Sequence, residues 1–349
     1  MRIVVDAFGS DTCPGPDVEG AVIAAREWGD EIILVGPEDR TRQELAKHNT
    51  QGLNIRVVHA PDVLTMADHS EEVRNKPESS IRVGMRMVKN GEADGFVSAG
   101  NTIACLSSAI FDLRRIRGIR RPALATVYPV TLAPMIFLDM GATVDPKPEY
   151  LLQFAQMGII YAERVLNITN PRVGLLANGE EEEKGTMVLR DTFALFKESD
   201  FNFVGNVEPK EVVKGHADVV VTDGFTGNIH IKTAEAVASF VKMVIKQDVL
   251  GGTLSKVGLV LMIPALVLAL PGLLFLLPGL RGLVKRLDYA EVGGGLLLGV
   301  DGVVIVGHGR SNAKAVRNAV LRAREAVAAQ IIPTIKAGLE ARRQGRAHG

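Results

Sequence analysis

Short apolar runs alternate with helical segments through the first 60 residues, and this alternation constrains the fold most. Residues 2–5, 31–35 and 55–59 are rich in Val and Ile and too short for helices, whereas residues 18–28 and 40–48 carry apolar side chains at helical spacing. This order with short links predicts a parallel sheet covered by helices on both faces. We therefore expect a three-layer, doubly wound α/β fold, in which ligands bind beyond the carboxyl ends of the strands.

A loop of small residues, 98–102, follows the apolar run 95–97 and precedes a helical pattern from 103 to 113. Main-chain N–H groups at the start of a helix are free to bind an anion such as phosphate. Gly100 would let the backbone approach the ligand, while Ser98, Asn101 and Thr102 add side-chain donors. An ordinary turn with a polar cap is the alternative for this loop taken alone.

The chain totals exclude several classes of protein. A length of 349 residues suits two domains or one large α/β domain with additions, and we expect a single catalytic domain over 1–335 and a basic, frayed tail over 336–349. The net charge of zero gives no pull toward nucleic acid. Cys13 and Cys105 lie far apart, and no His, Cys and carboxylate set has ligand spacing, so we expect no disulfide framework and no metal.

Two further features of the sequence narrow the function and the location. The dinucleotide fingerprint GxGxxG is absent, which argues against hydride transfer and leaves no cofactor implied. The first residues already form a strand and show no signal-peptide pattern, so we expect a protein that is not secreted.

Two loops of the second half resemble the 98–102 loop in their position. The strand expected at 172–177 is followed by four glutamates, 180–183, next to Lys184. The strand expected at 217–222 ends in Asp223 and the small residues up to Asn228, before a helix over 229–249. A solvated charged face is the alternative for the glutamate run.

Residues 257–280 carry no charge, and an uncharged segment of this length can span a bilayer. Pro264, Pro271 and Pro278 break the run, and a single crossing would separate the last strand–helix unit from the rest of the sheet. We expect an inserted apolar helical hairpin over 251–287 that dips into one leaflet, with a buried dimer core as the alternative. The side chains expected to meet lipid are Leu266, Leu270, Leu274, Phe275 and Leu277.

Two charged stretches flank the loop at 98–102. Residues 62–76 mix both signs and predict either a flap near the site or a solvated helix. Residues 113–122 hold arginines without acidic neighbours, which predicts a docking patch for an acidic partner, with a solvated turn as the alternative. The arginines are Arg114, Arg115, Arg117, Arg120 and Arg121.

Seven motifs follow one another along the chain: VDAFGSD (5–11), EADGFVSAGNT (92–102), GATVDPKPEYLLQFAQMG (141–158), GEEEEKGT (179–186), FVGNVE (203–208), VVVTDGFTGN (219–228) and GHGRSNAKAVRNAV (307–320). Together they resemble the PlsX family of bacterial phosphate acyltransferases. The resemblance implies a Rossmann-like sheet similar to phosphotransacetylases and isopropylmalate dehydrogenases. It also implies conversion of acyl-[acyl carrier protein] and inorganic phosphate to acyl phosphate and free carrier protein, which feeds phospholipid synthesis. A homodimer in the cytoplasm, peripherally bound to the inner face of the cell membrane, is implied as well. Alternatives are an acyl-CoA:phosphate acyltransferase and a non-catalytic membrane scaffold.

The resemblance also implies residue roles. Lys184 is expected to be catalytic, by neutralising phosphate, stabilising the oxyanion or protonating the leaving thiolate, and Asn228 is expected to donate to the oxyanion. The residues expected to bind or orient phosphate and substrate are Asp6, Gly9, Ser98, Gly100, Asn101, Thr102, Asp223, Gly227, His308 and Asn312. Ser10, Thr12 and Ile103 depart from the family pattern.

Overall fold

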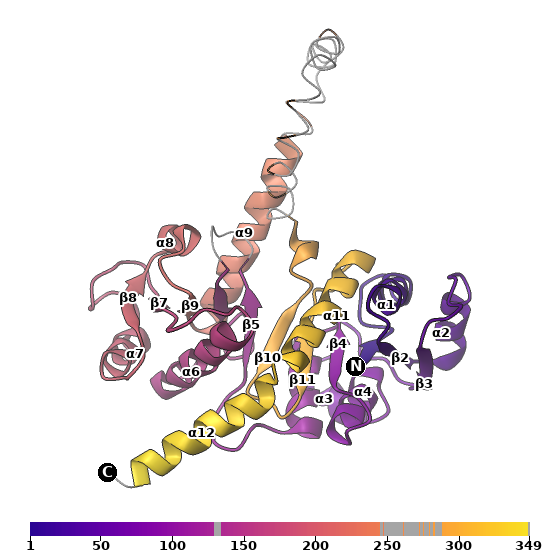
Figure 1. Cartoon of the computed structure of the whole chain (residues 1–349), viewed down its shortest axis with the longest axis horizontal. Coiled ribbons are helices and arrows are strands. Elements are labelled where there is room, and N and C mark those ends of the chain that lie inside the picture. The colour runs from indigo at the N-terminus through magenta and orange to yellow at the C-terminus, as the bar shows by residue number, and fades with distance from the viewer. Residues whose placement is uncertain are drawn as a thin grey trace.

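The computed structural model describes residues 1–128, 134–244 and 288–347, together with six isolated positions between 245 and 287. The described strands form one sheet in the order β3-β2-β1-β4-β11-β10-β5-β6-β9-β7-β8. The expected α/β class is confirmed (Figure 1). The strands are β1 (Arg2–Asp6), β2 (Glu31–Gly36), β3 (Ile55–His59), β4 (Gly95–Ser98), β5 (Ala123–Val127), β6 (Ile136–Leu138), β7 (Val173–Leu176), β8 (Phe203–Val207), β9 (Val219–Val221), β10 (Gly295–Leu298) and β11 (Val303–Val306).

Strand direction changes across the middle of the sheet. β3, β2, β1, β4 and β11 are parallel, β10 is antiparallel to both β11 and β5, and β6 is antiparallel to β5. β9, β7 and β8 then follow the direction of β6. The carboxyl ends of β6, β9 and β7 therefore lie at the edge where β4 and β11 begin. The loops after β1 and β4 therefore leave the sheet at one edge, and the loops after β7 and β9 leave it at the opposite edge, although they were expected to form one site.

Helices cover both faces of the sheet (Figure 1). They are α1 (Gly15–Trp28), α2 (Glu38–Leu45), α3 (Ser70–Asn75), α4 (Ser80–Lys89), α5 (Thr102–Ser108), α6 (Pro148–Arg164), α7 (Met187–Lys197), α8 (Pro209–Lys214), α9 (Gly224–Val244), α11 (Ala313–Ala328) and α12 (Ile331–Ala347). A π-helix, η1 (Ala109–Leu113), continues α5, and a 3₁₀ turn, η3 (Tyr289–Glu291), precedes β10. Residues 336–347 lie within α12, and the division into a catalytic domain and a basic tail stays a prediction.

The core is continuous on one face of the sheet and divided on the other. Alternate strand residues such as Val5 and Leu138 pack with α1, α6 and α11 in one cluster. On the opposite face, Phe96 belongs to a cluster with α4 and α5, whereas Phe137 belongs to a separate cluster that includes residues of α8 and α9. Met140 packs against both clusters. The divided face brings α5 and α9 to either side of the middle strands.

Helix α9 extends beyond the sheet (Figure 1), and several of its apolar side chains are exposed. Its exposed residues include Phe225, Ile229, Val237 and Phe240, which recur at helical spacing. A hollow of about 480 Å³ lies along the helix, lined in part by Ile229, Val237 and Phe240. This apolar side of α9 has no cover within the described chain.

The predicted hairpin over 251–287 and its residues Leu266, Leu270, Leu274 and Leu277 lie outside the described residues. Phe275 is described and is 86% exposed. Among the described residues, no helix combines the length and the apolar character needed to cross a bilayer.

Candidate functional site

Three loops meet where β1, β4 and β11 end. The N–H of Asp11 donates to the carbonyl of Gly309 at 2.8 Å, and the N–H of Gly307 donates to the carbonyl of Ser98 at 2.8 Å. A Cβ on Gly9 would lie 2.8 Å from the main-chain N of Ala99, so the first loop can approach the second only with glycine there. The loops after β1 and β4 lie together because these strands are parallel and end at one edge of the sheet, as the expected fold requires.

Asp6 holds the second loop through Ser98. The buried Asp6 Oδ2 accepts a hydrogen bond from Ser98 Oγ at 2.7 Å, and Ser98 Oγ accepts one from the N–H of Gly100 at 3.0 Å. Burial raises the pKa of Asp6, and the bond from Ser98 opposes that rise. Asp6 and Ser98 therefore fix the path of the backbone on which an anion would be bound.

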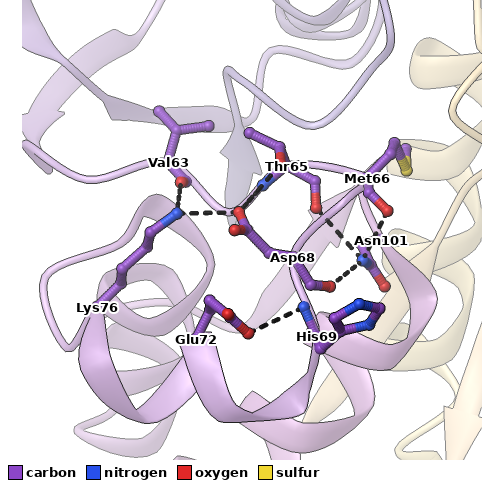
Figure 2. A network of polar contacts seen from close by, with 8 residues as sticks. All are labelled: Val63, Thr65, Met66, Asp68, His69, Glu72, Lys76 and Asn101. Atoms are coloured by element: carbon purple, nitrogen blue, oxygen red, sulfur yellow. Dashed lines mark hydrogen bonds and ion pairs between the residues drawn. The ribbon is translucent and has the colours of Figure 1, made fainter.

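Asn101 uses both ends of its side chain within the protein, and Figure 2 shows the contacts of its Nδ2 end. Its Oδ1 accepts from the N–H groups of Ile103 at 2.9 Å and Ala104 at 3.2 Å, which caps α5. Its Nδ2 donates to main-chain carbonyls of the segment 65–68. The cap leaves the N–H of Thr102, the first helical residue, without an intrahelical acceptor. The predicted phosphate donor thus has other partners, and the loop backbone remains available.

Asp17 is a buried carboxylate beside this site that the sequence did not reveal. Ser10 Oγ donates to Asp17 Oδ2 at 2.5 Å, and the Ser10 N–H donates to Oδ1 at 3.3 Å. Burial, together with the nearby charge of Asp6, raises the pKa of Asp17 to about 8. The departure from the family pattern at Ser10 was the only signal, because it supplies the hydroxyl partner.

We expect Asp17→Asn to change how stability depends on pH. The pKa of Asp17 rises from 3.8 to about 8 in the folded chain, so the folded state binds this proton more tightly than the unfolded state does. The free energy of unfolding of the wild type therefore loses this contribution as the pH rises from about 4 to about 8. The stability of Asp17→Asn relative to the wild type is expected to increase over that range, as measured by denaturant unfolding at pH 5 and pH 8. A difference independent of pH would contradict the assignment.

The third loop connects to α9. His308 Nδ1 accepts from the N–H of Arg310 at 3.3 Å, and burial lowers the pKa of His308. Asn312 caps α11 by accepting from the N–H of Ala315 at 3.0 Å. Arg310 Nη2 lies 3.9 Å from Glu235 Oε2 on α9. The middle of α9 therefore lies near the loop after β11.

At the other edge, Asp139 organises the loop after β6. Its carboxylate is buried and accepts main-chain N–H groups from Leu124 at 2.8 Å, Thr143 at 2.6 Å, Ala142 at 3.1 Å and Gly141 at 3.2 Å. Burial raises the pKa of Asp139 to about 6 against these four bonds. No motif in the sequence identifies this residue.

The first turn of α9 packs on that loop. A Cβ on Gly227 would lie 1.9 Å from the carbonyl oxygen of Asp139, so only glycine fits. A Cβ on Gly141 would lie 3.4 Å from Asn228 Nδ2, which shows that the half-buried Asn228 side chain lies against Gly141. Asp223 Oδ1 accepts from the N–H of Thr226 at 2.8 Å.

Lys184 lies in the loop after β7. Its side chain is 49% exposed, and its Nζ is 4.0 Å from Glu181 Oε2. Two of the neighbouring glutamates pair with lysines from other elements: Glu182 with Lys197 at 2.9 Å and Glu180 with Lys210 at 3.7 Å. Part of the glutamate run is therefore a solvated charged face with paired side chains, which was the alternative stated for it.

The predicted site residues form two groups. Among the described residues, no hydrogen bond or ion pair joins the loops of β1, β4 and β11 to Lys184 or Asn228. Helix α9 nevertheless links the edges, because Asn228 precedes Glu235 by seven residues, or about 10 Å along the axis.

The arginine stretch is on the surface. All five side chains are exposed, and none of them pairs with a carboxylate among the described residues. A hollow of about 420 Å³ lies there, lined by Phe111 and Ile110 together with Arg114, Arg115 and Arg117. This combination of apolar and cationic groups remains consistent with docking of an acidic partner, and the docking role stays a prediction.

Metal and thiol chemistry find little support in the described part of the chain. Residues 1–128, 134–244 and 288–347 contain no group of three or more His, Cys, Asp or Glu that could hold a metal ion. Cys105 is buried, and burial raises the pKa of its thiol to about 12, which disfavours the nucleophilic thiolate.

Comparison with known proteins identifies relatives over nearly the whole chain. The family described as fatty acid synthesis protein matches residues 1–334. A protein named phosphate acyltransferase from Herpetosiphon aurantiacus is 46% identical, with 97% of this chain and 98% of the relative covered. Another protein of that name, from Geobacter sulfurreducens, is 44% identical and covers 94% of this chain and 91% of its own length.

Solved structures share the fold. A phosphotransacetylase from Streptococcus pyogenes superimposes with a TM-score of 0.56 at 18% identity, covering 95% of this chain and 94% of that one. A branched-chain phosphotransacylase from Enterococcus faecalis gives a TM-score of 0.55 at 14% identity, covering 94% of this chain and 100% of that one. At these identities the likeness establishes the fold alone.

Proposed function

Because the chain belongs to the fatty acid synthesis protein family, whose relatives at 44–46% identity are named phosphate acyltransferases, we propose that it is a phosphate acyltransferase. It takes the acyl group of acyl-[acyl carrier protein] and inorganic phosphate, and it releases acyl phosphate and free carrier protein. The identity over nearly the full length carries this proposal.

The reaction needs positioning and charge stabilisation more than a strong base, because phosphate near neutral pH is already anionic. A phosphate oxygen attacks the thioester carbonyl, the C–O bond forms, the C–S bond breaks, and the sulfur leaves as thiolate that takes up a proton. The backbone of the 98–102 loop, held by Asp6 and Ser98, orients the phosphate.

Lys184 and Asn228 serve the reacting carbonyl in this proposal. Lys184 is a flexible, exposed cation that can move to the developing negative charge. Asn228 presents its side-chain amide from the first turn of α9. The contact of this side chain with Gly141 holds the backbone of that turn in place. Gly9, Gly100 and Gly227 support the site by allowing close approach of the backbone.

The patch of exposed arginines between residues 113 and 122 favours a carrier protein as the acyl donor. Acyl carrier protein is acidic, and exposed arginines that have no carboxylate partner within the described residues are suited to bind it. A CoA thioester has no acidic surface of this extent and would use the patch less.

The experiment is release of free thiol from palmitoyl-carrier protein and from palmitoyl-CoA, each with and without phosphate. We expect phosphate-dependent release from the carrier-protein substrate at the higher kcat/KM. Faster release from palmitoyl-CoA would favour the acyl-CoA alternative. Binding of carrier protein without any release would favour the scaffold.

The apolar side of α9 supports assembly into a homodimer, since a second copy can cover Ile229, Val237 and Phe240. The uncharged segment 257–280 follows α9 in the sequence and supports peripheral attachment of this cytoplasmic enzyme to the inner face of the membrane. Analytical ultracentrifugation with and without anionic vesicles tests both parts. A monomer that stays in the supernatant would contradict them.

A further inference from the structure

We propose that Asn101 is a positioning residue that fastens a strap, defined as residues 65–69, onto the loops that bind phosphate. The proposal rests on the phosphate acyltransferase function and gives Asn101 a task other than direct contact with phosphate. The strap and Asn101 are separated by more than 30 residues in the sequence and meet in Figure 2.

The contacts of Asn101 show how the strap is held. Nδ2 donates to the carbonyls of Thr65 at 3.3 Å, Met66 at 3.3 Å and Asp68 at 2.8 Å. An amide group has two N–H bonds, so three acceptors leave it no hydrogen for a ligand. The opposite end of the side chain caps α5, which makes Asn101 a bridge between the strap and the start of that helix.

The strap also touches the loop after β11. A Cβ on Gly309 would lie 2.6 Å from Met66 Cε and 2.5 Å from Asp11 Oδ1, so the methionine methyl group rests on that glycine. The strap is thus in contact with the second and third loops of the phosphate side, and Asp11 of the first loop lies against the same glycine.

A second anchor holds the strap from its other side (Figure 2). Asp68 Oδ2 accepts from the N–H of Thr65 at 2.6 Å and from Lys76 Nζ at 2.9 Å. Lys76 also donates to the carbonyl of Val63 at 3.1 Å. These bonds lower the pKa of Asp68, the bond from Thr65 most, and keep its carboxylate ionised. The strap is therefore a tied segment with two separable fastenings.

The two fastenings allow a test in which charge and position are separated. Asn101→Ser is neutral and keeps a good helix cap, but the hydroxyl is too short to reach the strap carbonyls. Asp68→Ala and Lys76→Met both break the second anchor and change the net charge in opposite directions. Lys47→Met is the matched control, because it breaks the ion pair at 2.7 Å between Lys47, in the turn after α2, and Glu44.

The first readout is KM for phosphate in the thiol-release assay. We expect Asn101→Ser to raise KM about tenfold with kcat changed by less than about threefold, as loss of one or two neutral hydrogen bonds would do. Asp68→Ala and Lys76→Met should both raise KM, and Lys47→Met should not. Opposite shifts for the two anchor variants would assign the effect to charge and overturn the proposal. So would unchanged KM in both anchor variants alongside a raised KM in Asn101→Ser, which is the result expected of a direct phosphate donor.

The second readout is independent of activity. The N–H groups of Thr65, Asp68 and His69 are hydrogen-bonded within the strap region, so their hydrogen exchange reports its order. We expect exchange there to accelerate about tenfold in Asn101→Ser, while the N–H of Cys105, in the first turn of α5, keeps its protection. Unchanged exchange in the strap would refute the fastening. An inactive wild type with accelerated strap exchange in the variant would instead refute the proposed function alone.

Discussion

Lys184→Ala is expected to reduce kcat for phosphate-dependent thiol release by about a hundredfold or more, the usual cost of removing a group that stabilises charge in the transition state. The side chain of Lys184 is 49% exposed, and its Nζ lies 4.0 Å from Glu181 Oε2, which is a weak ion pair. Its ammonium group therefore contributes little to the stability of the fold. The free energy of unfolding should therefore change little. The measurement is steady-state thiol release from palmitoyl-carrier protein together with thermal unfolding.

Lys197→Ala is the matched control for this effect. Lys197 is 63% exposed and pairs with Glu182 at 2.9 Å in the same acidic surface, so its loss changes charge equally without removing the proposed catalytic lysine. We expect kcat within about twofold of the wild type, because exposed ion pairs contribute little. Equal losses in the two variants would show that the surface charge, and not Lys184, supports the reaction.

Gly227→Ala is expected to have the largest effect on stability. A Cβ there would lie 1.9 Å from the carbonyl oxygen of Asp139 and 3.0 Å from its carbon, which are backbone atoms that no side-chain rotation can move away. The first turn of α9 must shift off the loop after β6, at a cost of about 3 kcal/mol or more in the free energy of unfolding. Activity should fall as well, because Asn228 is the next residue.

Gly338→Ala tests whether the effect is specific to that contact. Gly338 lies within α12, and its added Cβ would be 3.4 Å from Ile160 Cδ1, an ordinary contact. Replacing a helical glycine in this way is expected to stabilise by about 0.5–1 kcal/mol. Denaturant unfolding of both variants gives the comparison, and a Gly227→Ala protein as stable as the wild type would refute the packing argument.

The sequence predicted the strands of both halves well because their apolar runs are short and bounded by loops. It also predicted that the loops after β1 and β4 meet, since parallel strands joined by helices place their carboxyl ends at one edge. It missed β10, which lies after the uncharged segment 257–280 and pairs antiparallel with both neighbours. Without β10 the reversal of direction could not be foreseen, so Lys184 and Asn228 were expected beside Ser98.

Long-range side-chain partners also escaped prediction. Asn101 fitted the pattern of a phosphate donor, yet its amide is used by carbonyls that lie 33 to 36 residues away. Asp17 and Asp139 each follow or begin an expected element, where an acidic residue is ordinary. Their burial depends on which elements pack over them, and spacing along the chain carries no information on that.

The carboxylate of Asp139 has a consequence for how this sequence can vary in evolution. The four donors to the Asp139 carboxylate are main-chain N–H groups. These hydrogen bonds therefore do not depend on the side chains of Leu124, Ala142 or Thr143. Gly141 is different, because its φ of +131° is open only to glycine. Homologous chains that keep this turn are expected to retain the aspartate and the glycine while the neighbouring side chains drift.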